Sequence, residues 1–384
     1  MKSLLRMMAL LLALAFAAAA CAESTDDAQE DVTEESTPAE NDADSDSDGG
    51  DADEPEESET VDLTQGAGSV LDSIATNGEV KCGTRDALAG FAVLQADGTH
   101  QGFDSDFCRA IAAGVLGDAE AVDHVDLETA DRFTALQSGE VDVLVRNTTW
   151  TASRDGSEGA TFLQPNFYDG QGMMVHSSSS YNNLADMDNT VVCVASGTTT
   201  EGNAADEFSR LGLSVEVLSF ETNELIQEAF DGDRCDGWSA DSSALSGHRA
   251  NYIGGADAVR ILPEVFSKEP LAPAVRDGDT QWAQAVNWIV FATIQAEEFG
   301  ITSSNVDSFL TSENPNIQKF LGVEVDGAVL DPGLGLPTDF AYQVVKQVGN
   351  YGEIFDRHLT PLGLERGNNA LWFDGGLLYA PPYR

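Results

Sequence analysis

The 384-residue sequence contains few basic residues. It has 19 Lys and Arg against 66 Asp and Glu, which gives a formal net charge of −47 at pH 7. A nucleic-acid-binding surface needs clustered Lys and Arg to neutralise phosphates, and an anionic membrane surface attracts the same residues. The composition therefore argues against nucleic acid and against an anionic membrane surface as partners.

The sequence also lacks the common motifs of hydrolases and metal sites. It contains no G-x-S-x-G, no H-E-x-x-H and no C-x-x-C pair. None of its five histidines stands in a recognisable catalytic motif or at ligand spacing from a cysteine. We therefore predict no zinc site, no cofactor and no nucleophile–base pair.

Long apolar runs are confined to the start of the sequence. Lys2 and Arg6 precede a 14-residue apolar run, Met7–Ala20, which is too short to span a bilayer comfortably and predicts a signal peptide over residues 1–20. The run ends at Cys21 in a context that resembles a bacterial lipobox, so we predict that Cys21 is lipidated and anchors the protein to a membrane. Ala18 stands where a lipobox usually has Leu, so cleavage without lipidation stays an alternative. No transmembrane helix is predicted after this segment.

The segment that follows, residues 21–61, is predicted to be a disordered tether. Residues 22–60 contain 18 acidic residues and no Lys or Arg. So few large apolar side chains cannot offset the conformational entropy that folding would remove. The folded part is therefore expected over residues 62–384, which is long enough for two domains.

Besides Cys21 the sequence has four cysteines, which allow three pairings. Export favours disulfides over free thiols. The pairs Cys82–Cys108 and Cys193–Cys235 would each close a loop within one of the two lobes described below. Buried free thiols stay an alternative.

After residue 61 the pattern alternates between strands and helices. We expect strands over residues 78–84, 141–145 and 233–241, a strand turning into a helix over 190–201, and helices over 102–117 and 281–300. Asp104 or Asp106 suits the N-cap of the helix at 102–117, and Gly117 suits its end. Such alternation predicts an α/β fold with mostly parallel sheets, in which ligands bind at the carboxyl ends of the strands.

The decapeptide "RNTTWTASRD" (Arg146–Asp155) places Arg154 among hydroxyl side chains. A guanidinium is a planar fork of donors that fits a carboxylate, and neighbouring hydroxyls add further donors. The segment predicts a site for a small carboxylate, although a surface turn with an incidental arginine has the same local pattern.

A second candidate segment is "SGTTTE", in which Thr198 and Glu201 match a capping box. The backbone N–H groups of Thr199 and Thr200 would then be free to donate to an anion. Asp241 ends another predicted strand and could pair with an ammonium group. An ordinary capped helix and an N-cap role for Asp241 are the structural alternatives.

Trp150 and Trp238 lie close in sequence to the charged candidates. Aromatic side chains there could form a wall of a binding pocket. Core packing is the commoner use of tryptophan and stays an alternative for both residues.

Several segments, in this order, resemble the amino-acid-binding proteins of ABC transporters and are most similar to the general L-amino-acid-binding subgroup. The resemblance extends over about residues 61–384 and rests on "GFDSDFCRAIA", "RFTALQSGEVDVLVRNTTWTASRD", "YDGQGMMV", "SGTTTE", "DRCDGWSAD", "SKEPLAPAVRDGD", "VKQVGNYGEIFDRHL", "ERGNNALW" and "GGLLYAPPYR". The lipobox-like leader and the acidic tether depart from that subgroup.

This resemblance implies a two-lobed periplasmic-binding-protein fold of type II. One lobe would comprise residues 62–172 and 274–384, and the other residues 173–273. "DGQGMMV" and "KEPLAPAVR" would be the two hinge strands between the lobes.

The resemblance also assigns roles to the candidate residues. Arg154 and Thr149 would bind the ligand carboxylate, together with the turn Thr198–Thr200. The backbone carbonyl of Asn147 and the side chain of Asp241 would bind its ammonium group. Arg85 and Phe91 are candidates for lining the side-chain pocket.

The implied protein is an extracytoplasmic receptor, not an enzyme, that captures L-amino acids for the permease of an ABC importer. A dehydratase-like enzyme on the same fold and an amino-acid sensor domain are the alternatives. An enzyme would need a general acid or base in the cleft.

Overall fold

The computed structural model describes residues 69–384. The predicted signal peptide, Cys21 and the tether lie outside the described residues. The chain divides after Thr60 into two units, and every element below belongs to the second unit, Val61–Arg384. Within residues 69–384, no helix combines the length and the apolar character needed to cross a membrane.

Two five-stranded sheets form the framework. The first sheet contains, in spatial order, β5 (Val122–Asp126), β1 (Val80–Thr84), β6 (Val143–Leu144), β15 (Ala274–Arg276) and β7 (Ala160–Phe162). Strand β1 pairs in parallel with β5 and β6, and β15 pairs antiparallel with both β6 and β7. Four strands therefore run in one direction and β15 runs in the other.

The second sheet repeats this plan. Its spatial order is β11 (Val215–Phe220), β10 (Thr190–Ala195), β12 (Gly237–Asp241), β9 (Gln171–His176) and β13 (Val259–Ile261). Here β9 is the one antiparallel strand. Both sheets are mostly parallel, as expected from the alternation of strands and helices in the sequence.

The chain passes between the sheets twice, and the two passages pair with each other. Strand β8 (Phe167–Asp169) leads into β9, and β14 (Glu269–Leu271) leads back into β15. β8 and β14 form an antiparallel ladder in which Glu269 stands opposite Asp169. The antiparallel strand of each sheet is thus the one that follows a passage.

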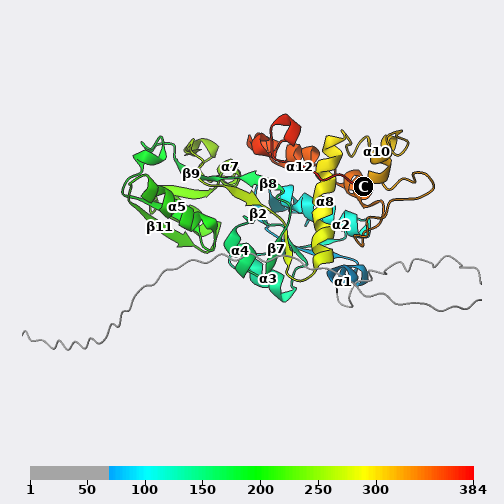
Figure 1. Ribbon diagram of the computed structural model, residues 1–384. Helices are drawn as coiled ribbons and strands as arrows, with labels where there is room; N and C mark the ends of the chain where they lie inside the picture. The colour runs from blue at the N-terminus through cyan, green and yellow to red at the C-terminus, as the bar shows by residue number, and fades with distance from the viewer. Residues whose placement is uncertain (1–68) are drawn as a thin grey trace, which may run out of the picture. The chain divides into compact units, whose positions relative to one another are not determined.

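Helices pack on both sheets (Figure 1). Their bounds are α1 Val70–Asn77, α2 Phe103–Leu116, α3 Arg132–Ser138, α4 Ala152–Ser157, α5 Thr199–Arg210, α6 Asn223–Asp231, α7 Ser242–Ala250, α8 Thr280–Glu298, α9 Val306–Phe309, α10 Pro315–Phe320, α11 Phe340–Gln347 and α12 Tyr351–His358. Helix α8 packs with α2, α11 and α12 at the first sheet, whereas α5, α6 and α7 pack on the second. Three short strands, β2 (Ala87–Leu88), β3 (Ala92–Leu94) and β4 (His100–Gln101), form a separate ladder.

Apolar side chains alternate between the two faces of each sheet. In β6, Val143 packs into the large core with α2 and α8, while Leu144 packs with α3 residues on the other face. In β9, Met174 and Met173 belong to different cores in the same way. Helices cover both faces, which explains why these strands read as nearly continuous apolar runs.

Helix α8 confirms the helix predicted over residues 281–300, and its residues Trp282, Ile289 and Ala296 are buried. The predicted N-cap of α2 was wrong. Gly102 caps α2 at a φ of 148°, while Asp104 and Asp106 lie in its first turn. A side chain at residue 102 would overlap the backbone of Phe91, so the close approach of these two segments requires glycine there.

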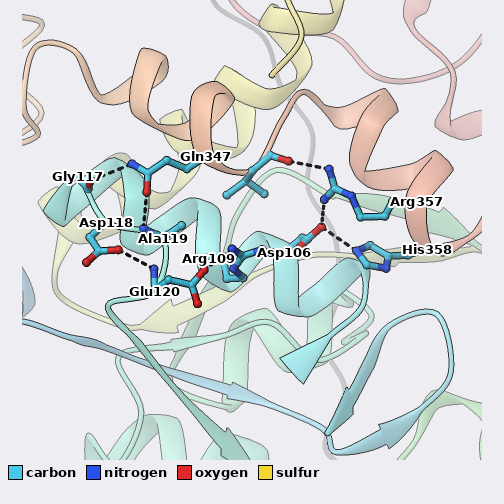
Figure 2. Close-up of polar contacts among 10 residues, drawn as sticks. Asp106, Arg109, Gly117, Asp118, Ala119, Glu120, Gln347, Arg357 and His358 are labelled. Carbon is cyan, nitrogen blue, oxygen red and sulfur yellow. Dashed lines mark hydrogen bonds and ion pairs between the residues drawn. The ribbon is translucent and has the colours of Figure 1, made fainter. Parts of the chain in front are cut away.

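Polar contacts join the ends of α11 and α12 to α2 and to the residues that follow it (Figure 2). Asp106 on α2 accepts hydrogen bonds from both Arg357 and His358 at the end of α12. Gln347 at the end of α11 donates to the Gly117 carbonyl and accepts from the Ala119 N–H, each at 2.9 Å. These contacts make the C-terminal helices part of the first sheet's helical layer.

Two disulfide bonds tie helices and loops to the sheets. Cys82 of β1 is bonded to Cys108 of α2, and Cys193 of β10 is bonded to Cys235 just before β12. Their Cα–Cα distances are 5.9 and 5.8 Å, within the usual range for a disulfide. The structure therefore contains the two pairs that close local loops.

Candidate functional site

A cavity of about 530 Å³, counted with its open mouth, lies at the carboxyl ends of strands from both sheets. Residues that follow parallel strands meet at one edge of a sheet, which explains why residues distant in sequence line the same cavity. Nine of the eleven predicted binding residues line it: Arg85, Asn147, Thr149, Arg154, Thr198, Thr199, Thr200, Trp238 and Asp241.

Arg154 is the third residue of α4 and is 9% exposed. Its Nη1 donates to the Thr149 carbonyl at 2.9 Å, and its Nη2 donates to the Gly197 carbonyl at 3.3 Å. Thr151 caps α4 by accepting the Arg154 backbone N–H. The guanidinium is therefore fixed by main-chain acceptors. Burial lowers its pKa from the ordinary value, and no carboxylate among residues 69–384 is in direct contact with it.

The turn from β10 into α5 brings Thr198, Thr199 and Thr200 to the cavity. The predicted capping box is not formed. The Thr198 hydroxyl donates to the Ala195 carbonyl at 2.6 Å, and Glu201 accepts from the Gly197 N–H rather than from the N-cap residue. Gly197, with a φ of 72°, forms the turn before the helix, and its N–H is the group that Glu201 binds. First-turn N–H groups of a helix have no partner within the helix, which suits them to an anion.

Asp241 ends β12 and occupies the N-cap position of α7, yet its side chain makes no capping hydrogen bond. It is 9% exposed and lines the cavity. Burial raises its pKa well above the ordinary value, and the negative charges of Asp169 and Glu269 add to this, against Arg154 and Arg132. A cation placed beside Asp241 would stabilise its ionised form.

Two carboxyl groups at the β8–β14 ladder lie near Asp241. Asp169 accepts hydrogen bonds from the Ser243 side chain and from the Gly170 N–H, and burial raises its pKa to about 6. Glu269 is buried and accepts from Thr199 at 2.9 Å and from Asn203 at 2.7 Å. The Glu269 carboxylate thereby connects the ladder to the first turn of α5.

Asn147 adopts a left-handed conformation with a φ of 36°. Its N–H donates to Asp104 Oδ2 at 3.0 Å, so the first turn of α2 holds this segment in place. Burial raises the pKa of Asp104 to about 7, although the Asn147 N–H and the charges of Arg85 and Arg146 oppose the shift.

The structure places two predicted residues elsewhere. Phe91 is 1% exposed and packs edge-on against Phe103 and Phe167 in the core. Trp150 is 39% exposed and stacks on Phe162 away from the cavity lining. Both lie near cavity residues in sequence, but the chain turns each of them away from the site.

Trp238 is the aromatic residue that does reach the cavity. It is 1% exposed and stacks on His248 with the ring centroids 4.4 Å apart. Burial, with a smaller effect from Arg85, lowers the pKa of His248 to about 3. The pair therefore forms an uncharged wall at neutral pH.

Residues 80–302 match the family model of bacterial extracellular solute-binding proteins, family 3. The chain belongs to this family. The predicted type II, two-lobed α/β fold with a two-strand connection is thereby confirmed.

Comparisons with individual relatives support this family assignment. It is 46% identical to the general L-amino acid-binding periplasmic protein AapJ of Rhizobium johnstonii, over 84% of this chain and 95% of the relative. It is 44% identical to the glutamate/glutamine/aspartate/asparagine-binding protein BztA of Rhodobacter capsulatus, over 82% of this chain and 94% of that relative. A solved periplasmic binding protein from Brucella ovis with glutathione bound is 43% identical, with a TM-score of 0.80 over 82% of this chain and 99% of that one.

Sequence reasoning missed several residues that line the cavity of this solute-binding protein. Arg132, the first residue of α3, is 3% exposed, and Arg146 is 2% exposed. A charged residue at a helix start or strand end usually faces solvent, so the sequence carries no local sign that these two are buried. His248 lies in α7 and is brought to the site by the packing of that helix.

Proposed function

We propose that this solute-binding protein is an extracytoplasmic receptor that captures L-amino acids by closing its two lobes and delivers them to the permease of an ABC importer. One observation carries the proposal. A guanidinium fixed near the first sheet, Arg154, and a carboxyl group at the end of a second-sheet strand, Asp241, line the same cavity. Opposite charges on opposite lobes match the two charged groups of an α-amino acid.

In this proposal the lobes comprise residues 62–172 with 274–384, and residues 173–273. Arg154 and Thr149 bind the carboxylate from one lobe, and the first-turn N–H groups of Thr199 and Thr200 bind it from the other. Asp241 and the Asn147 carbonyl bind the ammonium group. Binding both ends of the ligand favours the closed state, because only that state makes both sets of contacts.

The names of the relatives support the class of ligand, since both AapJ and BztA are named as amino-acid-binding proteins. The same comparison favours a receptor over a dehydratase-like enzyme. The raised pKa of Asp241 agrees with a site completed by an ammonium group and needs no proton-transfer role. We therefore propose that the protein carries out no reaction of its own.

Calorimetric titration of the purified full chain with each of the twenty L-amino acids tests the proposal. We expect saturable one-to-one binding by at least one of them and recovery of the ligand unchanged. Asp241→Asn should weaken every amino acid that binds, whereas the matched control Asp257→Asn, an exposed position, should weaken none. Absence of binding by all twenty, or conversion of a ligand to product, would contradict the proposal.

The membrane anchor is a separate proposal that rests on sequence alone. The short apolar run, Cys21 and the acidic segment after it favour a lipidated N-terminus joined to the receptor by a spacer. Cys21→Ser should release the protein from membranes and leave ligand affinity unchanged. Recovery of the wild-type protein in the soluble fraction, with a mature N-terminus other than Cys21, would refute the anchor.

A further inference from the structure

The cavity contains more positive charge than one amino acid can match. Four arginines line it, Arg85, Arg132, Arg146 and Arg154, against a single lining carboxyl group among the described residues, Asp241. Within residues 69–384, none of these four forms an ion pair with a carboxylate, although other arginines of the same region do. Buried guanidinium groups are normally paired, since an unpaired buried charge is costly.

The four arginines fall into two neighbouring pairs, and the charge of an arginine in one pair lowers the pKa of an arginine in the other. Arg132 and Arg154 both donate to the Gly197 carbonyl, at 3.2 and 3.3 Å, and both guanidinium groups lie within 6 Å of the Phe133 ring, at 5.1 and 5.7 Å. The Arg132 Nε is buried without a hydrogen-bond partner. This first pair lies beside Thr149 and the α5 turn, where the ligand carboxylate is proposed to bind.

The second pair stands at the ends of two neighbouring parallel strands. Strands β1 and β6 are paired in register, with Gly83 opposite Leu144, so Arg85 and Arg146 follow at the same level. The side chain of Arg146 is held by the Leu127 carbonyl at 2.7 Å and by Thr129 at 3.1 Å, and that of Arg85 makes no hydrogen bond within the described residues. After burial, the charge of Arg85 is the largest influence lowering the pKa of Arg146.

A zwitterion with an uncharged side chain would leave this second pair unmatched. Its carboxylate would neutralise the pair Arg132 and Arg154, and its ammonium group would meet Asp241. The charges of Arg85 and Arg146 act on Asp104, but burial raises its pKa to about 7, so it is only partly ionised at neutral pH. Glu128 and Asp126 attract both arginines, and Glu224 attracts Arg85, but none of the three forms an ion pair with either arginine.

We propose that the preferred ligand is an α-amino acid with a second carboxylate, bound by Arg85 and Arg146. This inference rests on the proposed function and adds the class of side chain. Free glutamate or aspartate carries this chemistry, and so does glutathione, a peptide whose γ-glutamyl end has a free α-amino acid group. Arg85 is the specificity-determining residue, because Arg146 is also tied to the protein main chain.

The test compares ligands that differ in charge but little in shape, with the full chain in a calorimeter. The wild type should bind glutamate, aspartate or glutathione about tenfold or more tightly than glutamine, because one charged contact is exchanged for a neutral one. Glutamate and aspartate report on free amino acids, and glutathione on the peptide form. Equal or tighter binding of glutamine or other neutral amino acids would overturn the inference while leaving the proposed function standing.

Arg85→Gln supplies the decisive variant, since Arg85 is only half-buried and its removal should leave the fold intact. We expect it to weaken the acidic ligand about tenfold or more and glutamine by less than about threefold, which would remove the preference. The matched control Arg276→Gln, at an exposed position, should change neither. Equal weakening of all ligands by Arg85→Gln would overturn the inference, and failure of every ligand to bind the wild type would remove the proposed function with it.

Discussion

Replacement of Arg154 by alanine is the most direct test of the proposed carboxylate site. The residue is 9% exposed, and its two side-chain hydrogen bonds go to neutral carbonyl groups, those of Thr149 and Gly197. The guanidinium is therefore largely desolvated, and within the described part of the chain no carboxylate is in direct contact with it. A bound carboxylate would supply that missing partner at a position that the protein has already organised.

The expected loss follows from the burial of this contact. Truncation of one member of a buried, hydrogen-bonded charge pair costs about 2–5 kcal/mol of binding free energy. At about 1.4 kcal/mol for each tenfold change, the dissociation constant should rise roughly 30- to 4,000-fold. The loss should be alike for every amino acid, because the α-carboxylate is common to all of them. Stability should change less, since removal of Arg154 also relieves its repulsion with Arg132.

Calorimetry of the wild type, Arg154→Ala and Arg154→Lys measures this directly, with thermal unfolding as a check that each variant is folded. Lysine should recover only part of the affinity, because an ammonium group does not provide the planar two-point contact of a guanidinium. Arg276→Ala, at an exposed position, is the matched control. A folded Arg154→Ala protein that binds its best ligand within about threefold of the wild type would refute the assignment.

The disulfides, Asp104 and two aromatic side chains give three further predictions. Peptide mapping without reduction should recover both disulfides, and loss of either should lower the free energy of unfolding by about 3–4 kcal/mol for loops of 26 and 42 residues; four alkylatable thiols would contradict this. The pKa of Asp104 in the folded state is raised to about 7, so between about pH 4 and pH 7 the folded state binds a proton that the unfolded state releases. As pH rises through this window, the free energy of unfolding of the wild type should fall by up to about 4 kcal/mol relative to Asp104→Asn. Stability curves of the two proteins that stay parallel over this range would contradict the prediction. Phe91→Ala should lower the free energy of unfolding by about 3–5 kcal/mol, and neither Phe91→Ala nor Trp150→Ala should alter the order of ligand preference. A changed order in either folded variant would show that the substituted residue belongs to the binding site.

The order of strands and helices could be predicted from the sequence because buried side chains recur along each element with the period of that element. The periodicity of α8 and the glycine that ends α2 are local signals, and the structure contains both. The cap of α2 was mispredicted because Asp104 has a favourable side chain for the position, while the choice of Gly102 depends on the distant Phe91 backbone. The N-cap of α2 therefore depends on a contact between distant segments and not on local residue preference.

The same distinction applies to the cavity. Arg154 and Asp241 stand at strand ends or next to hydroxyl groups, where the sequence itself points to a ligand. Arg132 carries no such sign. Arg146 stands in the same hydroxyl-rich segment as Arg154, but its burial in the cavity depends on how α3, β6 and the α5 turn meet. The register of β1 with β6 places Arg146 level with Arg85, and that register is not readable from either segment alone.

The charge of the whole chain and the charge of the cavity have opposite signs, which predicts an unusual salt dependence. At a distance, a protein of net charge −47 repels an anion such as glutamate, and this repulsion is screened over about 10 Å at 0.1 M salt. Inside the cavity Arg132, Arg146 and Arg154 are buried and Arg85 is half-buried, so contacts with them are screened less. Added salt should therefore raise the association rate of glutamate and leave its dissociation rate nearly constant.

Stopped-flow fluorescence can measure both rates, with Trp238 in the cavity wall as the reporter. Between about 0.02 and 0.3 M NaCl we expect the association rate of glutamate to rise about two- to tenfold, and that of glutamine, which has no net charge, to stay nearly constant. A glutamate association rate that falls with salt would show that the field of the arginines extends beyond the cavity mouth and outweighs the acidic surface. The balance between surface and cavity charge would then be the reverse of the one proposed, even if Arg154 and Arg85 bind the ligand.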